Sequence, residues 1–199
     1  MYFRSVRKSG IVNSRFMLFL RDNSGIAQPA LGLFVLLFVL VMMIFILNIA
    51  AYKAASDKLE DALAASGLAA SLIDTKQYGI DHSLIITEPE NVYEKYKETL
   101  MINLNLQDSF PRNTGIISGP VKVEDFRIYN VRNKVVTEIE VSESGVRNLG
   151  SRPLGQMKAP NGQVIELTGI YSEISFPINN RYGKNIFARK SKLTSVNTF

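Results

Sequence analysis

The most prominent pattern along the chain is an apolar run near its beginning. Residues 26–52 contain no charged side chain, and residues 31–47 contain nothing more polar than Gly32. A helix needs roughly 20 mainly apolar residues to cross the hydrocarbon core of a bilayer. A helix in the core of a soluble protein of this size is rarely apolar on every face. The run therefore predicts a transmembrane helix.

The helical pattern continues beyond the apolar run. Residues 50–73 contain no proline and one glycine, Gly67, and their apolar side chains fall near one face of a helix. We therefore expect one continuous helix of about 45 residues, half in lipid and half emerging from it. Small side chains in the emergent half, namely Ala62, Ala65 and Ala69, would allow a second helix to approach closely. Good helix propensity explains the same alanines equally well.

A second helix is predicted to begin at Thr87-Glu88-Pro89-Glu90. In this pattern Thr87 is the N-cap, Glu90 completes a capping box and Pro89 is tolerated in the first turn. Apolar residues then recur at intervals of three and four as far as about residue 106. The residues that form this apolar face are Val92, Tyr93, Tyr96, Leu100 and Leu104.

From Gly119 onward the apolar period changes from 3.6 to 2, which predicts β-strands. We expect residues 121–129 and 135–141 to form a hairpin, with a bulge at Glu124 and Asp125. Residues 142–162 hold four glycines and two prolines and predict an irregular loop. Residues 164–178 and 184–196 predict two further strands, and Pro177 indicates an edge position at that end of the first of them.

Together these elements predict an α+β protein, in which a long N-terminal transmembrane helix extends outside the membrane and a second helix packs on a small antiparallel sheet. The expected organisation is a basic leader at residues 1–25, the transmembrane and extended helix at 26–75, and an extracytoplasmic α+β domain at 76–199. Five basic residues and one acid precede the apolar run. Basic residues near a span remain cytoplasmic, so we expect the N-terminus inside and the C-terminal domain outside the cell membrane.

The net charge and the absence of cysteine narrow the function classes. Of the formal charge of +5, +4 lies in the leader, so the charge reflects membrane topology and does not indicate a nucleic-acid partner. The absence of cysteine excludes disulfides, Cys-ligated metals and thiol chemistry. The partner that the pattern itself implies is the lipid bilayer.

Candidate catalytic residues are few. His82 is the only histidine, and its neighbour Asp81 would point to the opposite side of a strand. Glu138 and Glu140 follow strand alternation, which predicts outward-facing side chains and not an acid/base pair. The glycines of residues 142–162 lack the strand–loop–helix context of a phosphate loop. We therefore expect a protein that is not an enzyme and has no cofactor, no metal and no small-molecule substrate.

The C-terminal part of the chain is basic. Five basic residues and no acid follow Glu173: Arg181, Lys184, Arg189, Lys190 and Lys192. These residues would suit an acidic partner, a neighbouring subunit or an anionic cell-wall polymer. Charged residues on an exposed edge strand also prevent unwanted strand pairing, which is the interpretation we favour.

The layout of residues 15–75 resembles that of type IV pilin-like proteins. It combines a short basic leader, the sequence RDNSGIAQ at residues 21–28 and an immediate long apolar helix. It is most similar to the TadE/TadF-type minor pilins (pseudopilins) of tight-adherence pilus systems. The resemblance implies that a prepilin peptidase cleaves between Gly25 and Ile26. The helix would then pack with other pilin-like or assembly subunits, as it does in the surface filaments that such subunits form. The family commonly has Glu at the fifth mature position, where this chain has Ala30.

The resemblance therefore predicts a non-enzymatic component or assembly factor of a tight-adherence (type IV-like) pilus or secretion apparatus. The alternative is an uncleaved signal-anchored protein with an extracytoplasmic binding or sensing domain, because an anchor of that kind has the same hydropathy pattern. An anchored hydrolase, a third interpretation, is disfavoured by the absence of a catalytic arrangement.

Overall fold

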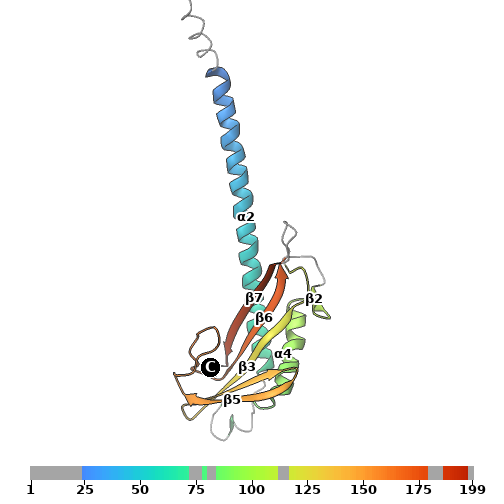
Figure 1. The fold of residues 1–199 in the computed structure, drawn as a ribbon, viewed down its shortest axis with the longest axis vertical. Coiled ribbons are helices and arrows are strands. Elements are labelled where there is room, and N and C mark those ends of the chain that lie inside the picture. Colours follow the sequence, from blue (N-terminus) through green and yellow to red (C-terminus); the bar gives the residue numbers. More distant parts are fainter. Residues whose placement is uncertain (1–23, 72–77, 80–83, 112–116, 179–185, 197–199) are drawn as a thin grey trace, which may run out of the picture. The chain divides into compact units, whose positions relative to one another are not determined.

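The computed structural model describes residues 24–71, 78–79, 84–111, 117–178 and 186–196 (Figure 1). The chain divides into two compact units, Met1–Ala51 and Tyr52–Phe199. We describe each by itself and call the second unit the head.

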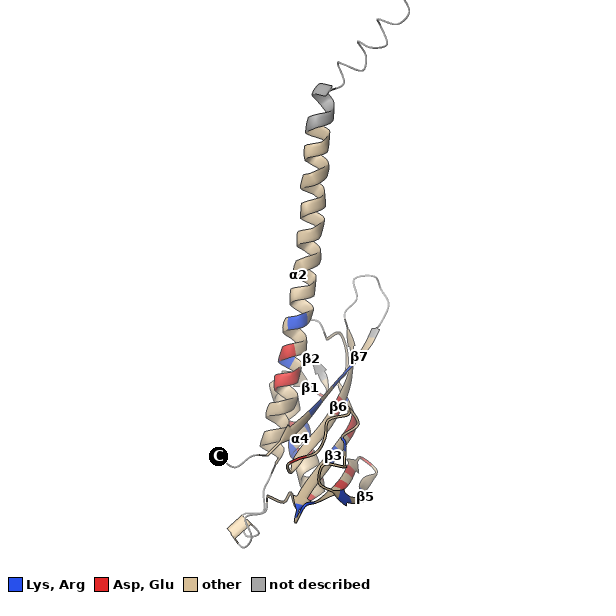
Figure 2. Ribbon diagram, turned by 90° about the vertical axis from the view of Figure 1, so that its left-hand side faces the viewer, with Lys and Arg blue, Asp and Glu red and all other residues tan. Residues whose placement is uncertain are grey.

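A single helix, α2 (Ser24–Ala70), contains 47 residues, which confirms the continuous helix that the sequence predicts. In the first unit its apolar side chains between Leu31 and Leu47 are all exposed, by 44–70 %. This segment is long and apolar enough to cross a membrane. In Figure 2 charged residues on α2 are confined to its C-terminal part.

The head contains a five-stranded antiparallel sheet in the order β5-β4-β3-β6-β7. Its strands are β3 (Lys122–Arg132), β4 (Val135–Ser142), β5 (Gly145–Pro153), β6 (Gly169–Ile178) and β7 (Ile186–Ser195). The other elements of the head are α4 (Pro89–Asn103) and a small hairpin of β1 (Leu106–Gln107) and β2 (Phe110–Pro111). The predicted α+β class is therefore confirmed.

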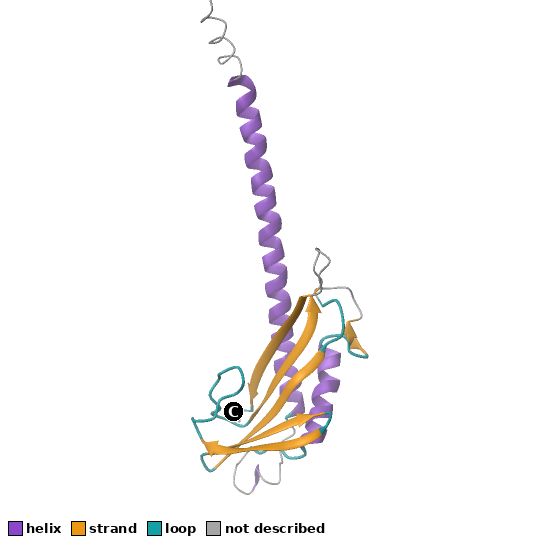
Figure 3. Cartoon of the chain, in the orientation of Figure 1, coloured by secondary structure: helices purple, strands orange, loops and turns teal. Residues whose placement is uncertain are grey.

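One face of the sheet is covered by α4 and by the part of α2 that belongs to the head (Figure 3). The predicted apolar face of α4 is buried against the sheet, and Tyr96 packs on Phe126 of β3 with ring centroids 4.8 Å apart. Leu59 and Leu63 of α2 enter the same core. Burial of large apolar side chains is the main favourable contribution to the free energy of folding of such a layer.

The opposite face has a smaller core beneath residues 154–168. It is formed by Tyr129, Val136, Met157, Ala159, Ile165 and Tyr171. The cover is a short turn in which Lys158 and Val164 form a β-bridge. The sheet is thus apolar on both faces at its centre, and the strands alternate between two cores.

The β3–β4 hairpin agrees with the prediction, whereas the start of α4 differs from it. The bulge in β3 lies between Val123 and Asp125, as predicted. The turn after β3 is formed by Asn133 and Lys134, both at positive φ, as a two-residue hairpin turn requires. The predicted capping box is wrong, because Pro89 takes the first helical position and Glu88 becomes the N-cap, without a side-chain cap.

The irregular loop expected at residues 142–162 is confirmed for residues 154–162 and wrong for residues 145–153. Residues 145–153 form the edge strand β5, paired with β4. Almost every β5 residue is exposed, so the strand has no buried face and shows no alternation of apolar and polar residues. Gly145 and Gly150 have φ of 122° and 119°, conformations that side-chain-bearing residues rarely adopt.

One expectation about β6 requires correction, because the strand begins at Gly169 and not at residue 164. The strand lies between β3 and β7, but at its Pro177 end only β7 continues the ladder, since β3 pairs with β6 no further than Ser175. Pro177 is tolerated there because its carbonyl oxygen accepts a hydrogen bond from Ser118 on the side where β3 has already ended. The missing proline N–H faces that same side, so no bond of the β6–β7 ladder is lost.

Candidate functional site

The first candidate surface is the part of α2 that belongs to the head. Ala62 is buried in the core of the head, whereas Ala65 and Ala69 are exposed. Only the latter two can therefore contact another protein without opening the head. Gly67 faces β7 so closely that a Cβ atom there would lie 3.0 Å from Cβ of Thr194. Association of α2 with another helix remains a prediction.

A charged clamp holds α2 on the edge strand β7. Lys192 Nζ donates to Glu60 Oε1 at 2.6 Å, and Lys190 Nζ lies 3.0 Å from Glu60 Oε2. Lys190 also donates to the Ser56 hydroxyl at 3.1 Å. Two of the five basic residues near the C-terminus thus bind α2. Arg181 and Lys184 lie outside the described residues.

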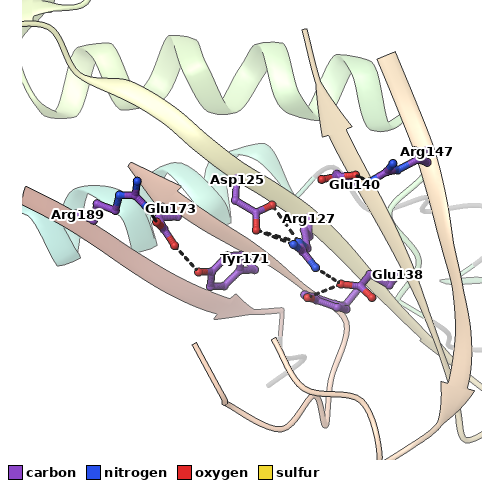
Figure 4. Close-up of polar contacts among 9 residues, drawn as sticks. Asp125, Arg127, Glu138, Glu140, Arg147, Tyr171, Glu173 and Arg189 are labelled. Atoms are coloured by element: carbon purple, nitrogen blue, oxygen red, sulfur yellow. Dashed lines mark hydrogen bonds and ion pairs between the residues drawn. The ribbon is translucent and has the colours of Figure 1, made fainter. Parts of the chain in front are cut away.

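A polar network occupies the sheet face opposite the helices (Figure 4). Arg127 on β3 donates to both oxygens of Asp125 at 3.0 Å and to Glu138 Oε1 on β4 at 2.8 Å. The Tyr129 hydroxyl donates to the same Glu138 oxygen at 3.0 Å. The side chain of Glu138 is only 15 % exposed, so it is more enclosed than strand alternation alone predicts.

The network extends along the sheet on both sides of Arg127. On β6, the Tyr171 hydroxyl donates to Glu173 Oε2 at 3.1 Å, and Arg189 of β7 lies 3.6 Å from the other Glu173 oxygen. On the opposite side, Arg147 of β5 pairs with Glu140 of β4. Figure 4 shows these side chains in a row that crosses the strands.

The surroundings of the buried tyrosines disfavour their ionisation. Burial raises the pKa of Tyr129, and the neighbouring Glu138 carboxylate raises it further. Burial also raises the pKa of Tyr171 and of Tyr96 on α4, although the Ser172 hydroxyl acts against the rise at Tyr96. These hydroxyls therefore remain protonated donors well above neutral pH.

The chemistry available to this network is that of a structural scaffold. Each of Asp125, Glu138, Glu140 and Glu173 is engaged by a cation or a tyrosine hydroxyl. Among the residues that the structure describes, no group of three or more His, Cys, Asp or Glu side chains is placed to hold a metal ion. Charge-assisted pairs of this kind connect neighbouring strands and restrict their register.

A cavity of about 440 Å³ lies between α4 and the ends of β3 and β4. Tyr93, Lys97 and Leu100 line it from α4, and Val121 and Glu143 line it from the sheet side. Lys97 Nζ lies 4.6 Å from the centre of the Tyr93 ring and 2.8 Å from Glu94 Oε1. The hydrogen bond to Glu94 raises the pKa of Lys97, which keeps the ammonium charged at the cavity wall.

Three other residues were singled out from the sequence, namely Gly25, Ile26 and His82. Gly25 and Ile26 lie in the first turn of α2, and nothing in the structure tests cleavage between them. His82 lies outside the described residues. The sequence alone did not predict the charged clamp at Glu60 or the row of charged side chains around Arg127. An Asp-x-Arg-x-Tyr alternation at residues 125–129 is the one local signal that could have indicated the row.

Known proteins offer no further guide to these surfaces. Comparison with protein-family models, with curated proteins and with solved structures finds no match to this chain.

Proposed function

We propose that this chain is a non-enzymatic, pilin-like subunit or assembly factor of a tight-adherence (type IV-like) pilus or secretion apparatus. The observation that carries the proposal is the continuity of α2. One 47-residue helix contributes an exposed apolar segment at its N-terminal end and packs into the core of the head at its C-terminal end. A helix built in this way can serve as membrane anchor and association element at once.

Part of the charge of the head is used internally. Arg127 on the open sheet face is paired with Asp125 and Glu138, and Lys190 and Lys192 of β7 are paired with α2. The lipid bilayer and other pilin-like subunits are the proposed partners, with the N-terminus cytoplasmic and the head extracytoplasmic.

A specific observation favours a second candidate function. The cavity of about 440 Å³ beside α4 falls in the size range of small-molecule sites. It supports the alternative of an uncleaved signal-anchored protein whose head binds or senses a ligand. The two candidates differ in the fate of the leader, since only the first expects processing between Gly25 and Ile26.

Mass spectrometry of the N-terminus separates these candidates. The full chain would be expressed in bacterial membranes with and without a prepilin peptidase that processes a reference pilin in the same cells. We expect a product that begins at Ile26 when the peptidase is present, and retention of the leader in a Gly25→Leu variant. Retention of residues 1–25 in the wild-type chain, while the reference pilin is cleaved, would contradict pilin-type processing.

The orientation can be tested separately because the chain contains no cysteine. A Ser144→Cys variant places a thiol on the exposed β4–β5 turn, and a Ser5→Cys variant places one in the leader. In intact cells, with the outer barrier permeabilised where there is one, a membrane-impermeant maleimide should label the first variant and not the second. The reverse labelling would overturn the proposed topology.

A further inference from the structure

The pairing of α2 with β7 shows at which end the chain enters the head. Ser56 contacts Lys190, Glu60 contacts Lys192, and Gly67 faces Thr194. Residue numbers increase together along both elements, so β7 runs in the same direction as α2. The start of β7 therefore lies at the end of the head through which the chain enters at Tyr52.

Strand register places an aromatic residue and two cations on one face at this end. Lys122, Ser175 and Arg189 are paired across β3, β6 and β7, and the next pair on the same face towards the end of the sheet is Pro177 with Phe187. Phe187 and Arg189 are two residues apart on β7 and share a face. That face is opposite to the one from which Lys190 reaches α2.

These three side chains are exposed to solvent. Phe187 is 70 % exposed, and the side chains of Lys122 and Arg189 are 74 % and 72 % exposed. The two cations each have an acidic neighbour at 3.6 Å, which is longer than a hydrogen bond. Both therefore retain donors for an external anion.

A single exposed aromatic residue on a soluble protein needs no explanation. Its position in the head decides the matter here, because Phe187 lies at the end of the head where Tyr52 connects it to residues 26–51, which belong to a helix apolar and long enough to span a bilayer. Aromatic residues are enriched at the level of lipid headgroups, and Lys and Arg near a membrane extend towards phosphate groups. Tyr52, which is 48 % exposed on α2, belongs to the same level of the head.

We propose that the β6–β7 end of the head binds the bilayer surface, with Phe187 inserted at the lipid interface and Lys122 and Arg189 bound to lipid phosphate groups. This inference rests on the proposed membrane span of α2. The head would then be held to the membrane at a second point, and rotation about α2 would be restricted. Anionic lipids would strengthen the contact, because each cation near an anionic surface adds attraction.

The absence of tryptophan in the chain provides a clean reporter. A Phe187→Trp variant places the only indole at the proposed contact. A Leu154→Trp variant is the matched control, since Leu154 is 38 % exposed and lies beside the β3–β4 turn at the opposite end of the strands. The full chain would be reconstituted in phosphatidylcholine–phosphatidylglycerol vesicles with and without brominated acyl chains.

We expect brominated lipids to quench the tryptophan at 187 at least about twofold more strongly than that at 154, with a blue-shifted emission at 187 only. Lys122→Glu combined with Arg189→Glu should reduce this quenching in anionic vesicles. Equal quenching of the two reporters would overturn the inference. A blue shift at 187 without quenching would also overturn it, because it would indicate a contact with protein instead of lipid.

Vesicle flotation after alkaline extraction distinguishes this failure from failure of the proposed span. A chain that is extracted from the vesicles does not span them. That result would contradict both the proposed membrane anchor and this inference. A chain that floats with the vesicles but is not quenched at 187 retains the anchor and loses the inference. Matching thermal unfolding of both tryptophan variants and the parent confirms that the head is folded.

Discussion

Glu60 on α2 and Lys192 on β7 form a hydrogen bond of 2.6 Å between residues separated by 132 positions in the sequence. Lys190 lies 3.0 Å from the other carboxylate oxygen of Glu60. The pair joins a helix that continues from the apolar run to the last strand of the sheet. The position of α2 on the head thus depends on a few side chains as well as on the apolar core.

Glu60→Gln removes the negative charge between the two lysines. We expect the melting temperature of the solubilised chain to fall by a few degrees at most, because the Glu60 side chain is 39 % exposed and water screens the pair. The difference from wild type should shrink in high salt. Asp61→Asn removes the same charge from the next, exposed position. An equal fall in that control would show that overall charge and not the clamp is responsible.

Gly169→Ala tests the closest approach between β6 and β7. An added Cβ would lie 2.5 Å from the carbonyl oxygen of Thr194, so a strand must shift. We expect a loss of about 1–3 kcal/mol in the free energy of unfolding, measured by denaturant titration. Gly67→Ala, whose Cβ would lie 3.0 Å from the Thr194 side chain, should cost less. The opposite ranking would contradict the packing described for Thr194.

Tyr96 and Tyr129 are both buried but differ in hydrogen bonding, so their phenylalanine variants can be compared directly. Among the described residues, the Tyr96 hydroxyl has no hydrogen-bond partner of ordinary geometry, so Tyr96→Phe should leave stability unchanged within about 0.5 kcal/mol or increase it. Tyr129→Phe removes the bond to Glu138 and should cost about 1 kcal/mol. Chemical unfolding of both variants measures the difference, and equal effects would contradict it.

Alkaline pH should destabilise the head. Burial raises the pKa of Tyr96 and Tyr129 above the ordinary value of 10.0. The unfolded chain therefore releases these protons first, and the stability that their protonation provides is fully present below pH 10 and lost as the pH rises further. The free energy of unfolding, followed from pH 8 to 11, should decline less steeply in Tyr96→Phe. A slope identical to wild type would contradict a raised pKa at Tyr96.

The exposed alanines of α2 allow a test of association that spares the fold. Ala65→Leu with Ala69→Leu should weaken the recovery of partner subunits in a pull-down while membrane insertion and thermal unfolding stay unchanged. Ala62→Leu should instead destabilise the head by about 1–3 kcal/mol, because Ala62 is buried. Unchanged recovery with the Ala65 and Ala69 substitutions would leave helix propensity as the explanation of these alanines.

The success of the sequence predictions depended on whether an element buries part of its surface. The apolar face of α4 and the alternation in β3 and β4 are visible in the sequence because α4 buries one side and the two strands contribute to both cores. The strand β5 shows no such pattern, since it is exposed throughout. The order of the strands was hidden for a related reason, because local sequence does not reveal that β6 pairs with both β3 and β7.

By itself, the sequence determined the apolar segment, the unbroken helix and the α+β class, because hydrophobic periodicity and helix propensity act between residues close in the chain. Only the tertiary structure decided that Glu60 meets Lys190 and Lys192, that Ala62 is buried while Ala65 and Ala69 are exposed, and that Phe187 lies beside two cations. These relationships depend on strand order and register, which bring residues from distant parts of the chain together.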